Sequence, residues 1–275
     1  MNAACSGEVI PLNLALNQPS PPCFGRKPFK HTITQIDKHV FDETYELNPQ
    51  TSSQWDGFRH VTAADILGPK ALSNGGMQAW ADHGIAGRGV LLDYQRYAEA
   101  YSIQPAYYDN FRITYHDLIK TAKMQNIDLR PARSGGDIET GDILLIRSGF
   151  LKYSSSLDSF EKATLHLRRS QFGPHDGQRY IGLEQSEEML DFLHDSYFSA
   201  VAGDQPAFEA WPSHKEYYLH EKLLALWGCP IGELWDLERL STRCAEKKQW
   251  MFFMTSSPNN IQGGVGSTSN ALAIL

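Results

Sequence analysis

The chain has 275 residues, which suits one large domain or two small ones and is enough to bury a sizeable core. Its 25 basic and 32 acidic residues give a net charge of −7, and the absence of a basic run disfavours nucleic acid as a partner. No apolar run approaches the roughly 20 residues that a membrane-spanning helix needs. Four cysteines without metal-binding spacing indicate reduced thiols, so we expect a cytoplasmic protein without a signal peptide.

The predicted elements alternate between strands and helices. In the first half of the chain we expect a strand at 8–17, a proline-rich loop at 18–28, a half-buried strand at 31–37, a helix at 76–83, a buried strand at 89–94, a helix at 95–101 and a helix beginning at 114. In the second half we expect a buried strand at 142–148, an irregular polar loop at 152–180, a helix at 184–195, a small apolar segment at 199–203, a helix at 214–227, a short strand or turn at 231–237, a helix to about 244, and strands at 250–256 and 271–275. This alternation indicates an α/β fold. Because candidate site residues lie in both halves of the chain, we expect a single domain over residues 1–275.

The polar segment 51–60 carries the strongest chemical signal. In an extended chain alternate side chains share a face, so Gln54, Asp56 and Phe58 would point one way, with His60 following if the strand runs on. A carboxylate and an imidazole on one face can bind a metal or move a proton. A turn is the alternative interpretation, because Ser, Asp and Gly are common in loops.

A second polar segment, at 219–237, completes a family resemblance. The chain resembles the putative cyclase family, the superfamily of bacterial kynurenine formamidases and isatin hydrolases, and is most similar to its fungal branch. The resemblance covers most of residues 25–275 and rests on SSQWDGFRH (52–60), HGIAGRGVLLDY (83–94), GDILLIRSGF (141–150), AVAGDQPAFEAWP (200–212), LHEKLLALWGCPIGELWDL (219–237) and NIQGGVGSTSNALAI (260–274). It implies a barrel-like mixed β-core with a second sheet and flanking helices.

The resemblance also implies a site. The family signature His-x-Gly-Thr-His-x-Asp-x-Pro-x-His places its metal-binding aspartate on Asp56 and its proton-transfer histidine on His60, whereas the two metal-binding histidines fall on Gln50 and Gln54. Further metal ligands of the family match His220 and Glu233 in context. Asp56, His220 and Glu233 would form one divalent site for manganese or zinc, with Gln54 as a weak ligand. The alternative is a metal-free cluster in which Asp56 and His60 act as catalytic acid and base.

Other residues are candidates for contact with substrate. They are Gln50, Gln54, Trp55, Phe58, Arg59, His83 and Asp204. For Trp55 and Phe58 a place in the core or pocket wall is favoured, and Arg59 suits an ion pair or a carboxylate clamp. A turn histidine and a turn-forming aspartate are the alternatives for His83 and Asp204.

We therefore expect an enzyme that hydrolyses an amide, lactam or lactone on an aromatic or polyketide-like metabolite. A metal-independent cyclase or dehydratase of secondary metabolism and a catalytically silent binding protein are the alternatives, because Gln50 and Gln54 replace strong ligands. No GxGxxG motif follows a strand, so we expect no nucleotide cofactor. The resemblance implies a homodimer, and the short segment after His60 would reshape the pocket rim.

Overall fold

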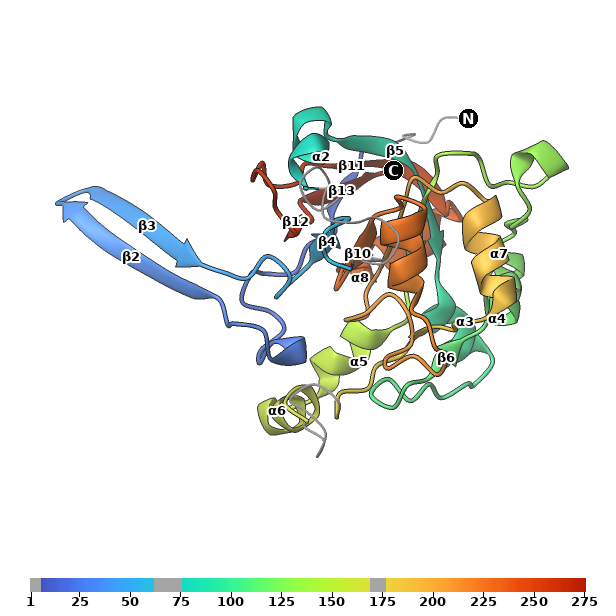
Figure 1. Ribbon diagram of the computed structural model, residues 1–275, viewed down its shortest axis with the longest axis horizontal. Helices are drawn as coiled ribbons and strands as arrows, with labels where there is room; N and C mark the ends of the chain where they lie inside the picture. Colours follow the sequence, from blue (N-terminus) through green and yellow to red (C-terminus); the bar gives the residue numbers. More distant parts are fainter. Residues whose placement is uncertain (1–5, 62–75, 169–176) are drawn as a thin grey trace.

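A curled nine-stranded sheet forms the centre of the computed structural model, which describes residues 6–61, 76–168 and 177–275. Its strands, in spatial order, are β1 (Val9–Pro11), β13 (Ala271–Ile274), β11 (Met251–Ser256), β5 (Ile85–Leu92), β7 (Ile143–Ile146), β9 (Ala200–Gly203), β10 (Ile231–Glu233), β4 (Gln54–Asp56) and β12 (Gly266–Thr268). The four strands from β5 to β10 are parallel to one another, and all other pairings within this sheet are antiparallel. The predicted α/β class and barrel-like mixed β-core are confirmed (Figure 1).

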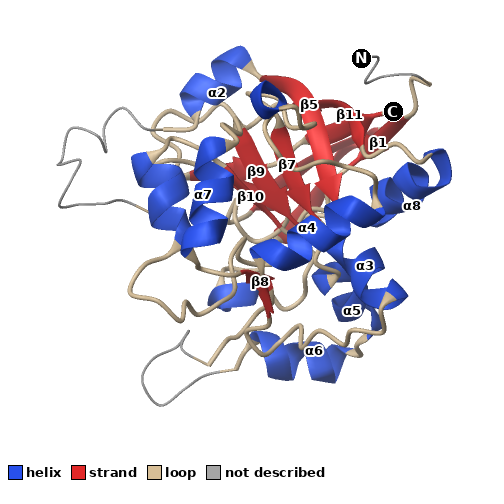
Figure 2. Cartoon of the chain, turned by 90° about the vertical axis from the view of Figure 1, so that its right-hand side faces the viewer, coloured by secondary structure: helices blue, strands red, loops and turns tan. Residues whose placement is uncertain are grey.

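Both faces of the sheet are covered, as the continuous apolar runs of β5 and β7 require. Val90 and Leu92 belong to one buried cluster, while Leu91 between them belongs to a second cluster on the opposite face. Four helices supply side chains to the first cluster: α3 (Tyr94–Ala100), α4 (Tyr115–Met124), α5 (Phe150–Ser156) and α7 (Glu187–Asp195). Helix α8 (Glu238–Lys247) packs into the second, and Figure 2 shows α4 and α7 in front of the strands.

Two short helices follow sequence signals closely. Helix α2 (Gln78–His83) ends at Gly84, whose φ of 68° lets its N–H bond the carbonyl of Trp80. Helix α4 begins at Thr114 with a capping box to Asp117.

Two predictions about where helices lie are wrong. The stretch 152–180, predicted to be irregular, contains most of α5 and all of α6 (Ser159–His166). Asp158 and Glu161 form a capping box at the start of α6. Residues 169–176 lie outside the described ranges. The helix predicted at 214–227 is reduced to η3 (Glu221–Leu226), a single turn of π-helix, because the chain before it forms a loop around the site. Two 3₁₀ turns, η1 (Cys23–Gly25) and η2 (Ala132–Ser134), and a two-stranded pair, β6 (Arg112–Ile113) with β8 (Gly182–Leu183), complete the described elements.

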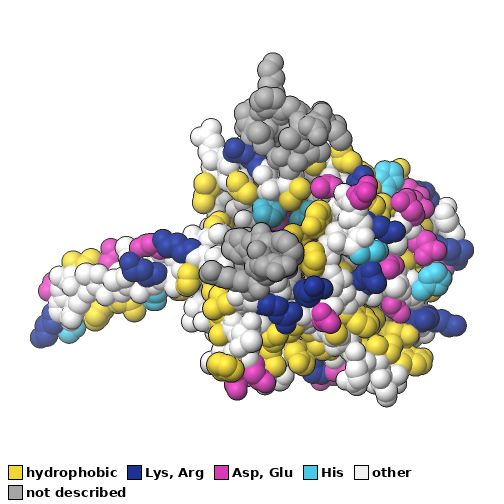
Figure 3. All heavy atoms as spheres, turned by 60° about the horizontal axis from the view of Figure 1, so that its bottom comes forward, with side chains coloured by type: hydrophobic (Ala, Val, Ile, Leu, Met, Phe, Trp, Pro, Cys, Tyr) yellow, Lys and Arg dark blue, Asp and Glu magenta, His cyan; other side chains and the backbone are white. Residues whose placement is uncertain are grey.

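A β-hairpin arm, formed by β2 (Lys30–Asp37) and β3 (Val40–Glu46), projects far from the rest of the chain (Figure 1). The strand at 31–37 was expected to be half-buried, which is wrong: every residue of both strands is exposed. The pairing puts His31, Ile33, Phe41, Glu43 and Tyr45 on one face of the arm. Ile33 and Phe41 are each 63% exposed, and Figure 3 shows hydrophobic side chains along the arm.

Three described cysteines, Cys23, Cys229 and Cys244, are buried and free. Across the described ranges, no helix combines the length and the apolar character needed to cross a membrane.

Candidate active site

Strand β4 sends its side chains to two different environments. Its antiparallel pairing with β10 places Gln54 opposite Glu233 and Asp56 opposite Ile231, so the polar side chains share one face. Trp55 points the other way and is fully buried; its indole N–H donates to Ser256 Oγ at 2.9 Å, and its ring packs edge-on against Trp235. Trp55 is therefore a core residue.

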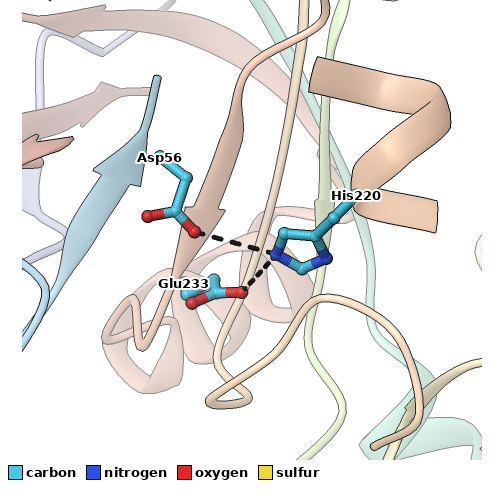
Figure 4. A group of neighbouring side chains, drawn as sticks. All are labelled: Asp56, His220 and Glu233. Carbon is cyan, nitrogen blue, oxygen red and sulfur yellow. Dashed lines mark hydrogen bonds and ion pairs between the residues drawn. The ribbon is translucent and has the colours of Figure 1, made fainter. Parts of the chain in front are cut away.

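The structure brings Asp56, His220 and Glu233 together, although they are far apart in the sequence (Figure 4). Asp56 comes from β4, Glu233 from the end of β10, and His220 from the residue before η3. His220 Nε2 lies 3.1 Å from Glu233 Oε1 and 3.7 Å from Asp56 Oδ2, and one ligand atom from each residue lies within 4.8 Å of the others. All three side chains are buried.

Glu209 completes the surroundings of His220 and was missed by the sequence analysis. Its Oε1 accepts from the Nδ1–H of His220 at 2.6 Å and from the backbone N–H of the same residue at 2.9 Å. Its Oε2 accepts from the N–H of Leu219 at 2.5 Å and from the side chain of Gln185 at 2.9 Å. A glutamate between Phe208 and Ala210, inside an apolar segment, was the signal that could have identified it, because buried carboxylates need specific partners.

Burial and mutual attraction together set the charges of this cluster. Burial lowers the pKa of His220, but the surrounding carboxylates of Asp56, Glu209 and Glu233 outweigh it and hold that pKa well above its usual value. Burial and the neighbouring charge of Asp56 raise the pKa of Glu233. Burial also opposes ionisation of Asp56, yet His60 and His220 hold its pKa below the usual value.

Two glutamines bind the carboxylates through their amide N–H groups. Gln50 Nε2 lies 2.5 Å from Asp56 Oδ1 and 2.9 Å from His60 Nδ1, and Gln54 Nε2 lies 2.5 Å from Glu233 Oε2. The Oε1 of Gln54 accepts from Arg26 at 3.3 Å. Because Gln50 must donate to the carboxylate, it also donates to His60 Nδ1, which leaves the proton of neutral His60 on Nε2.

The residues present fit a divalent metal. Asp56 Oδ2 is buried and has no hydrogen-bond partner among the described residues. Glu209 takes up the Nδ1–H of His220, the arrangement that usually orients a metal-binding imidazole, and so leaves Nε2 facing Asp56 and Glu233. Two carboxylates and one imidazole are a suitable donor set for such an ion, with Asp56, His220 and Glu233 as the residues that would hold it.

A cavity of about 420 Å³ adjoins this cluster. His60, whose side chain is 27% exposed, lies in its wall with Nε2 3.8 Å from Asp56 Oδ2. The wall is mainly apolar, and the described residues that line it are Phe24, Arg26, His60, Val61, Pro206, Ala207, Trp211, Tyr218, His220 and Glu233. Arg26 and the aromatic residues of this wall were not among the site residues predicted from the sequence.

None of the seven residues predicted to contact substrate is among the described residues that line the cavity. Gln50 and Gln54 bind the carboxylates beside it, and Trp55 lies in the core. Arg59 donates to the carbonyl oxygen of Gly263, and Phe58 packs edge-on against Trp80. His83 is exposed in the last turn of α2.

Asp204, also predicted to contact substrate, is buried where β9 ends. It accepts hydrogen bonds from the N–H and hydroxyl of Ser148 and from the N–H of Gly149, at the start of α5, and burial raises its pKa to about 6. The segment after His60, expected to reshape the pocket rim, lies almost entirely within residues 62–75, outside the described ranges.

A family model described as "Putative cyclase" matches residues 10–210. A crystal structure described as a novel cyclase is similar over 99% of this chain and 88% of its own, with 24% identity and a TM-score of 0.80. An isatin hydrolase bound to the product analogue thioisatinate is similar over 98% and 92% of the two chains, with 16% identity and a TM-score of 0.67. A predicted metal-dependent hydrolase from Bacillus stearothermophilus is similar over 97% of both, with 17% identity and a TM-score of 0.57. No curated protein matches the chain.

The pairing of Glu209 with His220 predicts a measurable shift. Glu209→Gln keeps the shape of the side chain but removes its negative charge, so in protein treated with chelator we expect the pKa of His220 to fall by about 1–3 units. NMR titration of the histidine ring would measure it. Because the pKa of His220 is raised in the folded state, its positive charge stabilises the fold at low pH. This contribution to stability is lost as the pH rises through the folded-state pKa, and in Glu209→Gln it should be lost at a lower pH.

Glu216→Gln is the matched control, because Glu216 is exposed on the same loop. It should leave the titration of His220 unchanged. An unaltered pKa of His220 in Glu209→Gln would contradict the electrostatic role assigned to Glu209.

Proposed function

The chain belongs to the family described as "Putative cyclase", and we propose that it is a small-molecule enzyme that hydrolyses an amide, lactam or lactone bond with the help of a divalent metal. One observation carries the proposal: a buried Asp–His–Glu group borders an apolar cavity, with His60 in the wall of that cavity. The structural similarity to isatin hydrolase and to a metal-dependent hydrolase supports the same reaction class.

Manganese or zinc is the proposed metal, held by Asp56, His220 and Glu233. When bound, such an ion polarises a carbonyl oxygen and lowers the pKa of water. Glu209 keeps the imidazole of His220 oriented, and Gln50 and Gln54 fix one oxygen of Asp56 and one of Glu233. These contacts leave Asp56 Oδ2 and His220 Nε2 directed at the same space.

His60 is the proposed proton-transfer residue. Because Gln50 donates to its Nδ1, neutral His60 carries its proton on Nε2, the nitrogen near Asp56 Oδ2. To act as an acid, the ring must take up a second proton on Nδ1, which displaces the hydrogen bond from Gln50. The imidazolium then donates its Nε2 proton to the leaving nitrogen or oxygen, and Nε2 can accept a proton again as the site is reset.

The cavity suits a substrate with one or two flat rings. Its volume of about 420 Å³ is within the usual range for small-molecule sites. Phe24 and Trp211 meet edge-on with ring centroids 5.3 Å apart, and Trp211 stacks on Tyr218 at 5.2 Å. We propose an aromatic or polyketide-like metabolite on this basis, acted on in the cytoplasm, for which the free buried cysteines are the support.

A second candidate function has one observation in its favour. The amide N–H groups of Gln50 and Gln54 already stabilise Asp56 and Glu233 as anions, which a metal-free acid–base site also requires. In that case His60 and Asp56 would transfer protons at a carbonyl-activated carbon, with cyclisation or dehydration in secondary metabolism as the outcome.

The reaction is tested with N-formyl aryl amines, isatin-like lactams and aryl lactones, assayed with added Mn²⁺ or Zn²⁺. We expect turnover of at least one class, and we expect His60→Ala to lower kcat by about 10²–10⁴-fold with little change in KM, because a proton-transfer group is lost. His83→Ala, an exposed histidine, is the control and should retain activity. Full activity in folded His60→Ala would contradict the role of His60, whereas tight binding of a hydroxylated aromatic without turnover of any compound would favour the second function or a silent binding protein.

The metal is tested by elemental analysis of protein purified without chelator, which should contain close to one equivalent. Chelator should lower Tm, because a ligand that binds only the native state stabilises it. Glu233→Gln should remove both the metal and the chelator effect, whereas Glu246→Gln on the surface should change neither. A metal-free protein that is indifferent to chelator would move the chemistry to the acid–base cluster.

We also propose a homodimer in which the β2–β3 arm contacts the second copy. A two-stranded hairpin is marginally stable alone, and this one exposes Ile33, Phe41 and Tyr45 on the same face. Sedimentation should give a mass of about twice 30.9 kDa. Ile33→Asp combined with Phe41→Asp should give monomer, whereas Thr32→Asp with Thr44→Asp on the opposite face should not; a wild-type monomer at micromolar concentration would refute the dimer.

A further inference from the structure

Among the described residues that line the cavity, Arg26 alone carries a permanent positive charge. Arg26 directly follows η1, the turn that also supplies Phe24 to the cavity wall. Its guanidinium lies 5.3 Å from the centre of the Phe24 ring. The turn therefore places a cation and an aromatic face side by side at the site.

Arg26 is anchored but not neutralised. Its Nη1 donates to the carbonyl oxygen of Gln50 at 2.5 Å and to Gln54 Oε1 at 3.3 Å, and both acceptors are uncharged. Within the described residues, no carboxylate oxygen lies within ion-pair distance of Arg26 and no hydrogen bond is formed by its Nε or Nη2, since both of its bonds come from Nη1. A guanidinium offers five N–H donors in a fixed fork, so most of its hydrogen-bonding capacity remains for a ligand.

The positive charge of Arg26 matters because the neighbouring cluster is rich in carboxylates. Asp56, Glu209 and Glu233 place three carboxylates in or behind one side of the cavity, balanced within the cluster only by His220. Without a bound metal, this side of the cavity would repel an anionic substrate unless another cation held it. Arg26 is that cation, and its two anchors are the backbone of Gln50 and the side chain of Gln54, the residues that bind Asp56 and Glu233.

We propose that Arg26 binds a carboxylate on the aromatic ring of the substrate and so makes the enzyme selective for aryl carboxylates. The fork of the guanidinium matches a carboxylate in two parallel hydrogen bonds. The ring would then lie against Phe24, Trp211 and Tyr218, whose rings form part of the apolar wall. The proposal rests on the proposed function for the site, but its test does not require turnover.

The test compares two ligands of equal shape, 2-naphthoate and 2-naphthamide, by calorimetry. Chelator-treated protein is used, so that no metal can hold the carboxylate. We expect the wild-type protein to bind the naphthoate at least 10-fold more tightly than the amide, and Arg26→Gln to lose this preference. Arg26→Lys should keep part of it, because lysine supplies the charge without the fork.

Arg59→Gln is the matched control, since Arg59 bonds Gly263 and does not line the cavity. It should keep the wild-type preference. The inference would be overturned if Arg26→Gln retained the preference for naphthoate, or if Arg26→Lys kept it in full. It would also be overturned if Arg26→Gln weakened the binding of both ligands equally and lowered Tm, because Arg26 would then be a structural anchor for Gln50 and Gln54. Naphthoate preference without hydrolysis of any substrate would leave the inference standing and remove only the proposed reaction.

Discussion

Three buried carboxylates around the imidazole of His220 are the constraint on which the rest of the site depends. Asp56, Glu209 and Glu233 are at most 1% exposed, and an unpaired buried charge costs several kcal/mol. The chain meets this cost with N–H donors, so the loop before η3 is bent until the amides of Leu219 and His220 reach Glu209. The loop conformation, the orientation of His220 and the position of the cavity wall all follow from that requirement.

Gln50 and Gln54 help to satisfy the buried carboxylates by donating hydrogen bonds to Asp56 and Glu233. The family resemblance implies imidazoles at positions 50 and 54, where a ligand lone pair would face a metal. In this chain both amides turn an N–H toward a carboxylate instead, and neither adds charge to the cluster. The carboxylates are thereby held in place whether or not a cation lies between them, and one of their oxygens, Asp56 Oδ2, stays free to bind it.

Much of the fold could be predicted, because apolar runs such as 89–94 and capping residues such as Thr114 act locally. Local rules could not show that the strand at 31–37 projects away from the core. Alternating apolar and polar side chains indicate that a strand has two different faces, but they do not indicate what covers either face. The convergence of Asp56, His220 and Glu233 came from the family pattern. Glu209 and Arg26 remained hidden because their roles arise from long-range contacts that no spacing in the sequence reveals.

Strand β4 is only three residues long, and its register decides which of its side chains face the site and which face the core. Gln54 and Asp56 face the site while Trp55 fills the core, and both neighbouring strands hold this arrangement. Inserting or deleting one residue beside β4 would exchange the two faces, burying an amide and a carboxylate among tryptophans and pushing an indole into the site. We therefore expect insertions and deletions to be tolerated poorly next to β4 and better in segments such as the hairpin arm, where no core has to be matched.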